Sequence, residues 1–229
     1  MKTQILCATA LLSGWGGLLE ARDFQIRALS VFQGYPSSGE VYVHEAGGSG
    51  TAVKLKRYLN HESQLLELKG NHVIFTTEAS AESIGDETKK LGELDLPAKL
   101  ARGIVFFSPA DGDEPAAAHL VDDSAKGFPA GTFKVINLSS LEVKIELEQK
   151  PFPCAPQKET LIAKAPVNDR NASGMRAFYE DEAAPQGWKQ FAASMWPNPG
   201  KKRGLQIILP AQGGQAVTLR GFNDVVEVK

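Results

Sequence analysis

The chain has 229 residues, which is enough for one large domain or two domains of ordinary size. Hydrophobic residues make up 42% of the sequence and charged residues 23%, a balance typical of folded globular proteins rather than disordered ones. The net charge of −2 argues against a nucleic-acid-binding protein, because contacts with phosphates require a basic surface.

The first predicted element is a signal peptide at residues 1–21. Lys2 precedes the apolar stretch 5–19, and Ala21 is a small residue in front of the polar sequence that begins at Arg22. This order is typical of a secretory signal peptide that is cleaved after its last small residue. We therefore expect an exported protein, in the periplasm or outside the cell, without a transmembrane segment once the signal peptide is removed.

Removal of the signal peptide leaves Cys154 as the single cysteine, because Cys7 lies within the removed segment. An internal disulfide is then excluded, and the fold must depend on its apolar core. No histidine lies near Cys154 in the sequence to raise its thiolate fraction. We do not expect this cysteine to be a catalytic nucleophile.

Short runs of β-branched and aromatic residues, separated by turn residues, recur along the rest of the chain. Every second residue is apolar in residues 142–148, which places Val143, Ile145 and Leu147 on one face of a strand. Residues 40–45 show the same alternation. Many short strands at this spacing predict an all-β sandwich or barrel.

Two segments of the chain match each other at a constant offset of 101 residues, as in Asp123 and Asp224. Residues 102–112 align with residues 203–213 at this offset. Two upstream matches keep the same order: residues 24–30 with 133–139, and residues 40–43 with 142–145. The repetition favours duplication of one β unit over a single larger sandwich.

We therefore predict an all-β fold of two tandem antiparallel β-sandwich (Ig-like) units after a cleaved signal peptide. The first unit is expected at residues 22–125 and the second at residues 126–229. Whether the two units share one core is left open by the sequence.

No catalytic, metal-binding or cofactor-binding pattern stands out in the sequence. The four histidines are not at the spacing of metal ligands, and neither HExxH nor CxxC occurs. The acidic segment 111–114 is typical of a solvated hairpin tip, because it lacks the ligand spacing of an EF-hand. We therefore expect no catalytic residues, no metal and no cofactor.

Trp188 and Trp196 are the candidate ligand-binding residues. They lie near each other in the sequence, among further aromatic residues. Exposed aromatic rings on β-sandwiches can stack on sugar rings, so a polysaccharide or another cell-wall component is the expected ligand. The competing explanation is that one ring packs in the core and the other is partly exposed.

The second half of the sequence resembles uncharacterised exported β-sandwich proteins of bacteria, a family of unknown function. The resemblance covers residues 128–229. Its motifs are residues 128–139, the Met195-Trp196-Pro197 motif, residues 203–208 and residues 219–221. The resemblance implies a sandwich in a bacterial envelope and supplies no functional residues.

The function that we expect is that of a non-enzymatic binding or structural module of the cell envelope, with a polysaccharide or an envelope protein as partner. One alternative is a carbohydrate-active hydrolase that uses acidic residues between the two units. Such an enzyme would require a concave site with acidic groups of perturbed pKa. Another alternative is an envelope assembly protein that pairs through strand edges, which requires an uncovered, uncharged edge strand.

Overall fold

The structure, a computed structural model, describes residues 21–45, 47–211 and 217–226. The predicted signal peptide, except for Ala21, and the predicted turn at 212–214 lie outside the described residues. Strands dominate the described part of the chain, which confirms the all-β sandwich prediction. No helix among the described residues is both long and apolar enough to cross a membrane.

The strands fall into two sets of eight, which we call the first unit and the second unit. The first unit contains β1 (Arg22–Leu29), β2 (Glu40–His44), β3 (Thr51–Lys56), β4 (Gln64–Leu68), β5 (His72–Thr76), β6 (Lys90–Asp95), β7 (Arg102–Ser108) and β8 (Ala117–Asp122). The second unit contains β9 (Phe133–Asn137), β10 (Val143–Leu147), β11 (Lys150–Cys154), β12 (Lys158–Ile162), β13 (Ala172–Glu180), β14 (Trp188–Pro197), β15 (Lys202–Pro210) and β16 (Val217–Val225). Two short 3₁₀ helices, η1 (Ala81–Gly85) and η2 (Pro185–Gly187), complete the described elements.

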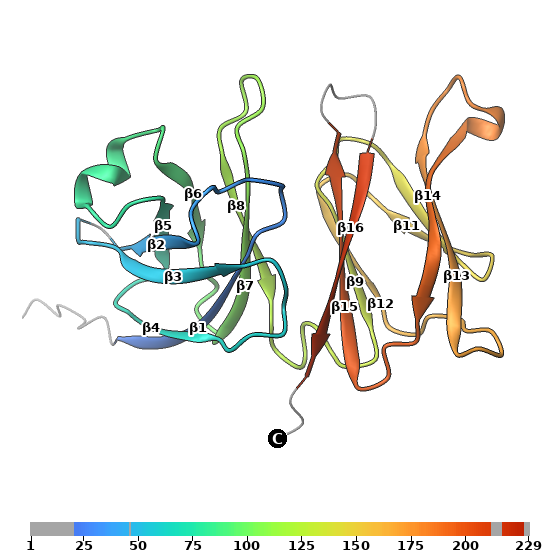
Figure 1. Ribbon diagram of the computed structural model, residues 1–229, viewed down its shortest axis with the longest axis horizontal. Coiled ribbons are helices and arrows are strands. Elements are labelled where there is room, and N and C mark those ends of the chain that lie inside the picture. Colours follow the sequence, from blue (N-terminus) through green and yellow to red (C-terminus); the bar gives the residue numbers. More distant parts are fainter. Residues whose placement is uncertain (1–20, 46, 212–216, 227–229) are drawn as a thin grey trace, which may run out of the picture.

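The two units have the same strand order. In the first unit, one layer runs β4-β1-β7-β8 and the other runs β3-β2-β5-β6. In the second unit, the layers run β12-β9-β15-β16 and β11-β10-β13-β14. Adding eight to each strand number of the first unit gives the order of the second, and the two units lie side by side in Figure 1.

The prediction of purely antiparallel sheets is wrong for three strand pairs. β1 is parallel to β7 and to β3, and β9 is parallel to β15. A parallel pair requires a long crossover between its strands, and here the first strand of each unit joins a strand that lies far along the chain. Apolar alternation does not reveal which strands pair, so the sequence could not predict these partners.

The strand register also corrects the alignment of the two units. Ile26 pairs with Gly103, and Phe133 pairs with Gly204, so the positional equivalent of Phe133 is Ile26 and not Phe24. The matched phenylalanines nevertheless share a packing role. A Cβ on Gly103 would lie 2.8 Å from the Phe24 ring, and a Cβ on Gly204 would lie 2.4 Å from the Phe133 ring. Each glycine thus leaves room for a phenylalanine ring.

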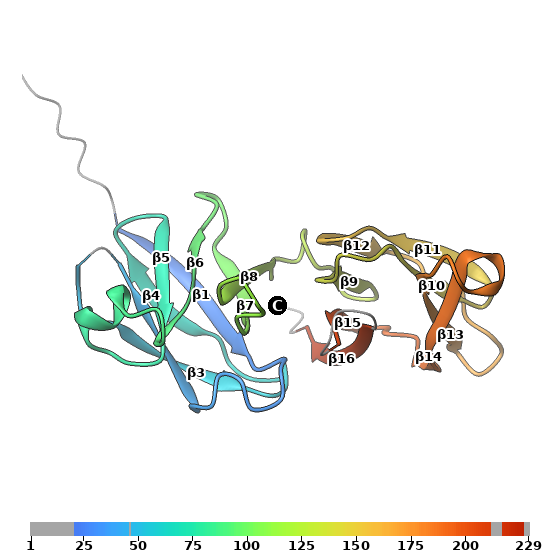
Figure 2. The ribbon, with the colours of Figure 1, turned by 90° about the horizontal axis from the view of Figure 1, so that it is seen from above.

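Three apolar cores hold the molecule together. One lies inside each sandwich, built around Phe75 in the first unit and Ile145 in the second. The third core lies between the units and combines residues from both, such as Phe106 and Ile207. Figure 2 shows the resulting order, with the layers that contain β7 and β15 in the middle of the molecule.

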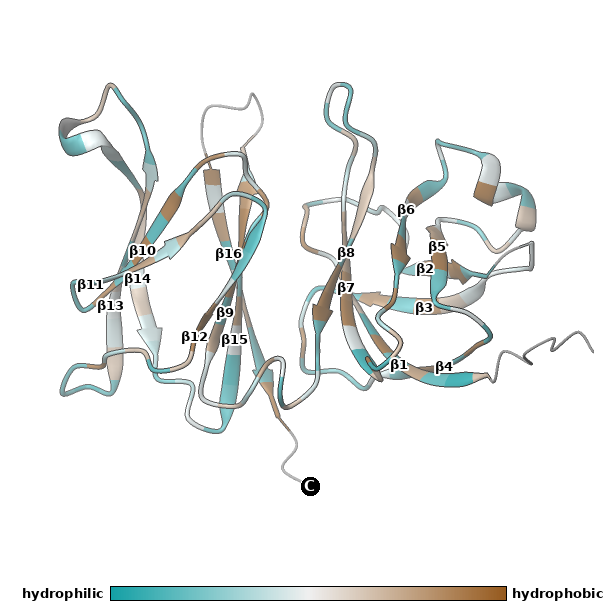
Figure 3. Cartoon of the chain, turned by 180° about the vertical axis from the view of Figure 1, so that it is seen from behind, coloured by the Kyte–Doolittle hydropathy of each residue, from teal (hydrophilic) through white to brown (hydrophobic). Residues whose placement is uncertain are grey.

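The third core explains why the apolar runs in β7 and β15 do not alternate. Val105 and Phe107 face the core of the first unit, whereas Ile104 and Phe106 face the second unit. A strand that is covered on both faces is apolar at successive positions rather than at every second one. Apolar segments of β7 and β8 are visible in brown in Figure 3.

A buried cluster of four charged side chains also joins the units. Arg27 Nη2 lies 2.7 Å from Asp123 Oδ1 and 2.8 Å from Asp224 Oδ2. Arg203 Nε donates to Asp224 Oδ2 at 2.9 Å, and the same guanidinium pairs with Asp123. Both arginines also donate to backbone carbonyls, Arg27 to that of Leu59. Two positive charges balance two negative ones, so the cluster carries no net charge.

The arginines keep the Asp224 carboxylate of this cluster ionised. Burial alone would raise the pKa of Asp224, but the hydrogen bonds and charges of Arg27 and Arg203 outweigh it and lower this pKa below 3.8. A lowered carboxyl pKa contributes stability that is present above the pKa of the unfolded chain. This contribution is lost as the pH falls below about 3.8.

Candidate functional site

The structure places Trp188 and Trp196 on the same strand, β14, but on opposite faces of the sheet. Trp196 pairs with Ser173, which is buried, whereas Trp188 pairs with Glu180, which is exposed. A β-bulge opposite the step from Ala177 to Phe178 changes the alternation between them. The two tryptophans therefore do not form one platform.

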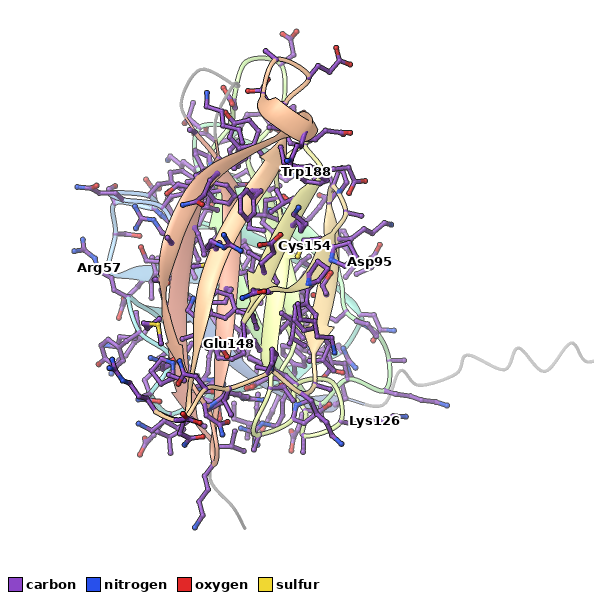
Figure 4. The ribbon with its side chains drawn as sticks, turned by 90° about the vertical axis from the view of Figure 1, so that its right-hand side faces the viewer. Arg57, Asp95, Lys126, Glu148, Cys154 and Trp188 are labelled. Atoms are coloured by element: carbon purple, nitrogen blue, oxygen red, sulfur yellow. The ribbon has the colours of Figure 1, made fainter. Side chains whose placement is uncertain are left out.

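The two tryptophan rings differ in their surroundings, since a cation lies over Trp188 whereas Trp196 is buried. The Lys144 ammonium lies 4.6 Å from the ring centroid of Trp188 and 5.0 Å from that of Phe178. Trp196 is 6% exposed, and its ring lies 4.7 Å from that of Phe133. Figure 4 shows Trp188 near one end of the outer sheet, far from Glu148.

The carboxylates between the two units do not form an accessible acidic pair. The Asp123 and Asp224 side chains are 1% exposed, and both are paired with arginines. A general acid must reach its substrate, and these two side chains are too buried to do so. No group of three His, Cys, Asp or Glu side chains among the described residues could hold a metal ion.

A Ser–His contact in the first unit is the nearest approach to a catalytic pair. The Ser108 hydroxyl lies 3.0 Å from His119 Nε2. Burial lowers the pKa of His119 to about 4, and its ring stacks on Phe106 at 4.9 Å. The imidazole is therefore neutral at pH 7 and packed between the units. Its position is that of a packing residue.

The Cys154 thiol is buried, as its place in the core of the second unit requires. Burial raises its pKa to about 11, so the thiol is protonated at neutral pH.

A pocket of about 250 Å³ opens in the second unit between the edge strands β14 and β16. We call this opening the seam. Its walls combine apolar rings and chains with three polar side chains. They are formed by Phe133, Ser194, Met195, Trp196, Pro197, Gln206, Leu219, Gly221 and Asn223. Trp196 thus lines the seam by one edge while most of its ring is buried.

Gln206 is the unusual residue of the seam. It is only 6% exposed, and its neighbours along β15, Leu205 and Ile207, belong to the core between the units. No hydrogen bond of its side-chain amide is found among the described residues. Its amide lies beside Gly221, where a Cβ would be 2.6 Å from Gln206 Oε1. The amide atoms are not among the fully buried side-chain atoms that lack a partner, so they are accessible from the pocket and free to form hydrogen bonds there.

The first unit has an apolar pair at the equivalent place. Gln206 pairs with Gly221, and at the offset of 101 residues the corresponding pair is Val105 with Leu120. Val105 is completely buried in the first core, and Leu120 packs against that core. The duplicated position is therefore polar and accessible from a pocket in one unit, and apolar and sealed in the other.

The seam of the first unit is closed by its backbone. A Cβ on Gly92 of β6 would lie 2.3 Å from the backbone nitrogen of Ala118 in β8, so these two edge strands are in direct contact. Gly92 has φ +132°, a conformation that favours glycine. β14 and β16 also approach each other in the second unit, but a pocket lies between them.

A larger pocket of about 470 Å³ lies in the first unit, between the β2–β3 turn and β4. Its most prominent polar group, the Glu45 carboxylate, accepts hydrogen bonds from the backbone N–H groups of Lys69 and Gly70 at 2.6 and 2.9 Å. This carboxylate stabilises the loop, and we assign it no ligand.

Sequence reasoning did not single out Gln206, although a signal was present. The alignment at the offset of 101 residues places this polar residue opposite Val105 in an otherwise apolar run. The chain matches no protein-family model and no curated protein.

Proposed function

We propose that this protein is an exported, non-enzymatic binding module of the cell envelope whose ligand enters the seam between β14 and β16. The observation that carries the proposal is the Gln206 amide, which makes no side-chain hydrogen bond with the described residues and lines a pocket where the first unit has a sealed apolar pair. Ligand sites commonly combine apolar and aromatic side chains with a few placed polar groups, and the seam contains both kinds.

The comparison with the first unit supports the same proposal. In the first unit, the equivalent positions hold Val105 and Leu120. This apolar pair closes the sandwich and leaves no pocket there. An unpaired amide has no structural benefit, because a valine at position 206 would cost nothing in hydrogen bonding. A ligand that pairs with Gln206 gives this residue a role.

Export to the envelope is supported by the order of residues in the segment 1–21. The test is to express the full chain in a bacterial host and to sequence the N-terminus of the exported product. We expect the exported product to begin at Arg22. An unprocessed protein that stays in the cytoplasm would contradict the envelope location.

Binding through the seam is tested with the double variant Gln206→Val/Gly221→Leu, which recreates the apolar pair of the first unit. Arrays of polysaccharides, peptidoglycan fragments and peptides are probed with the exported wild-type protein and with this variant. We expect a ligand of the wild type that the variant binds at least tenfold more weakly. Equal binding by both proteins, or chemical conversion of the bound ligand, would overturn the proposal.

A further inference from the structure

Resting on the function just proposed, we infer that the ligand is an extended polypeptide that adds to β14 as a fifth strand of the sheet β11-β10-β13-β14. In this arrangement the main chain of the ligand pairs with β14, and one apolar side chain of the ligand fills the seam. Addition of a strand to an open sheet edge is a general mode of peptide recognition.

The main chain of β14 has groups free to pair with such a strand. Asn198 N donates to Asn171 O at 3.0 Å, which fixes the alternation of hydrogen bonds between β14 and β13. By this alternation Trp196 and Ser194 direct their N–H and C=O groups at β13, and Ala193 and Met195 direct theirs away from it. β14 ends its sheet, and among the described strands it pairs with β13 alone.

The free edge of β14 has only one charge, and its proline, Pro197, and its β-bulge lie outside the segment from Ala193 to Met195. Lys189 is the single charged residue among the ten of the strand, and Met195 is 51% exposed. Natural edge strands are commonly protected by charges or prolines. The equivalent strand β6 has Lys90, Glu93 and Asp95 among its six residues. The outer strand at the other end of the same sheet, β11, contains two prolines.

The chemistry of the seam matches a peptide better than a sugar. The Gln206 amide offers one donor group and one acceptor, the same pair that a peptide group requires. The walls of the pocket are mixed, and in its volume of about 250 Å³ an apolar side chain could pack against Phe133, Met195 and Leu219 beside the polar groups. Side chains of an added strand alternate between the two faces of the sheet, so at least one would point into the seam. The ring of Trp196 is buried and the Lys144 ammonium lies over the ring of Trp188, which reduces the stacking surface for a sugar.

The experiment uses a library of nine-residue peptides with apolar residues at alternate positions, titrated against the exported full-length protein by calorimetry. The best peptide is also made with N-methyl groups on its main chain. We expect at least a tenfold loss of affinity from N-methylation, and a similar loss in Gln206→Val/Gly221→Leu. Hydrogen exchange at the amides of Ala193 and Met195 should slow when the peptide is bound.

Ala193→Pro removes an N–H group that faces away from β13, so the fold should be retained while peptide affinity falls at least tenfold. Trp188→Ala is the matched control on the other side of the sheet and should bind normally. N-methylated peptides test the same main-chain contact in the wild-type protein, should Ala193→Pro fail to fold.

Two results would overturn the inference while leaving the proposed function intact. One is binding of an oligosaccharide, and of no peptide, that is lost in Gln206→Val/Gly221→Leu. The other is self-association of the protein through β14, detected by light scattering and lost in Ala193→Pro, without any peptide binding. If neither peptides nor glycans bind and the protein is monomeric, both the inference and the proposed function are wrong.

Discussion

The two units of this protein share a strand order but differ at their lateral edges. In the first unit, β1 passes from β4 to β3, and β6 packs directly on β8, so both lateral edges are closed. In the second unit, no described strand links the two sheets at either side, and the seam between β14 and β16 stays open. The frame is the same in both units, and the difference lies in the side chains and strands that close it.

The difference between the seams depends on few positions. Replacement of a Val–Leu pair by Gln206 and Gly221 removes apolar volume and adds an amide at the same place in the frame. Residues at the contact between the units, such as Asp123 and Asp224, occupy equivalent positions in both copies. A repeated fold can thus keep its structural contacts in both copies and acquire a binding pocket in one.

The largest expected effect comes from the charged cluster, in which the repeat provides its own control. Arg203→Ala would leave Asp224 and Asp123 with one arginine fewer in a buried site, and we expect a loss of about 3–5 kcal/mol. Arg102, the equivalent in the first unit, is 47% exposed and 3.9 Å from Asp123. Arg102→Ala should cost less than about 1 kcal/mol. Urea unfolding measures the free energy of unfolding of both variants. Equal losses in Arg203→Ala and Arg102→Ala would contradict the idea that the buried arginine contributes more than the exposed one.

Acid should destabilise the first unit through His119, whose equivalent in the second unit is the exposed Arg220. Because the folded pKa of about 4 lies below the ordinary 6.5, the unfolded chain takes up the proton first as the pH falls. Stability from this group is complete above about pH 6.5 and declines towards pH 4, by about 3 kcal/mol in total.

The measurement is urea unfolding across this pH range in the wild type and in His119→Phe. The variant should lack most of the dependence. Part of it should remain, because burial also lowers the pKa of His61. If the stability of His119→Phe depends on pH as strongly as that of the wild type, His119 is not the source of the pH dependence.

An exchange of residues between the seams should have opposite effects in the two units. Val105→Gln places an amide in a sealed apolar core, and we expect a loss of roughly 1–3 kcal/mol. Gln206→Val removes an unpartnered amide, and stability should stay the same or rise. Thermal unfolding of both variants checks this. A marked loss in Gln206→Val would mean that the amide has a structural partner in the fold.

The smallest effect is expected at Trp188. Its contact with the Lys144 ammonium is worth about 0.5–1 kcal/mol at such a site, so Trp188→Ala should lower stability by about that amount. Ligand binding should not change. Loss of glycan binding in Trp188→Ala would instead support the prediction from the sequence that Trp188 is a sugar-binding residue.

The sequence predicted those features that local pattern controls. Alternation in residues 142–148 places Val143, Ile145 and Leu147 in the second core as expected. The pairing of strands and the packing of the two units were harder to predict. An apolar run such as that of β7 does not indicate whether its second face packs against a helix, a sheet or another unit. The parallel pairing of β1 with β7 and the third core were therefore beyond the sequence.

The candidate site was predicted only in part. The sequence pointed to β14 through its tryptophans, and Trp196 does line the seam. The bulge that places Trp188 on the other face leaves no recognisable sequence signal. The role of Gln206 depends on Gly221, whose missing side chain leaves room for the Gln206 amide, and this contact appears only when β15 and β16 are paired.

The core between the units has a consequence for how the protein is made. A polypeptide that emerges with its N-terminus first completes β8 before β9 exists, and during that interval Ile104 and Phe106 lack their covering layer. Each unit, made alone, would expose the apolar surface of the third core to solvent. We therefore expect the two units to depend on each other for a fully buried core, unlike sandwich domains that are joined only by a linker.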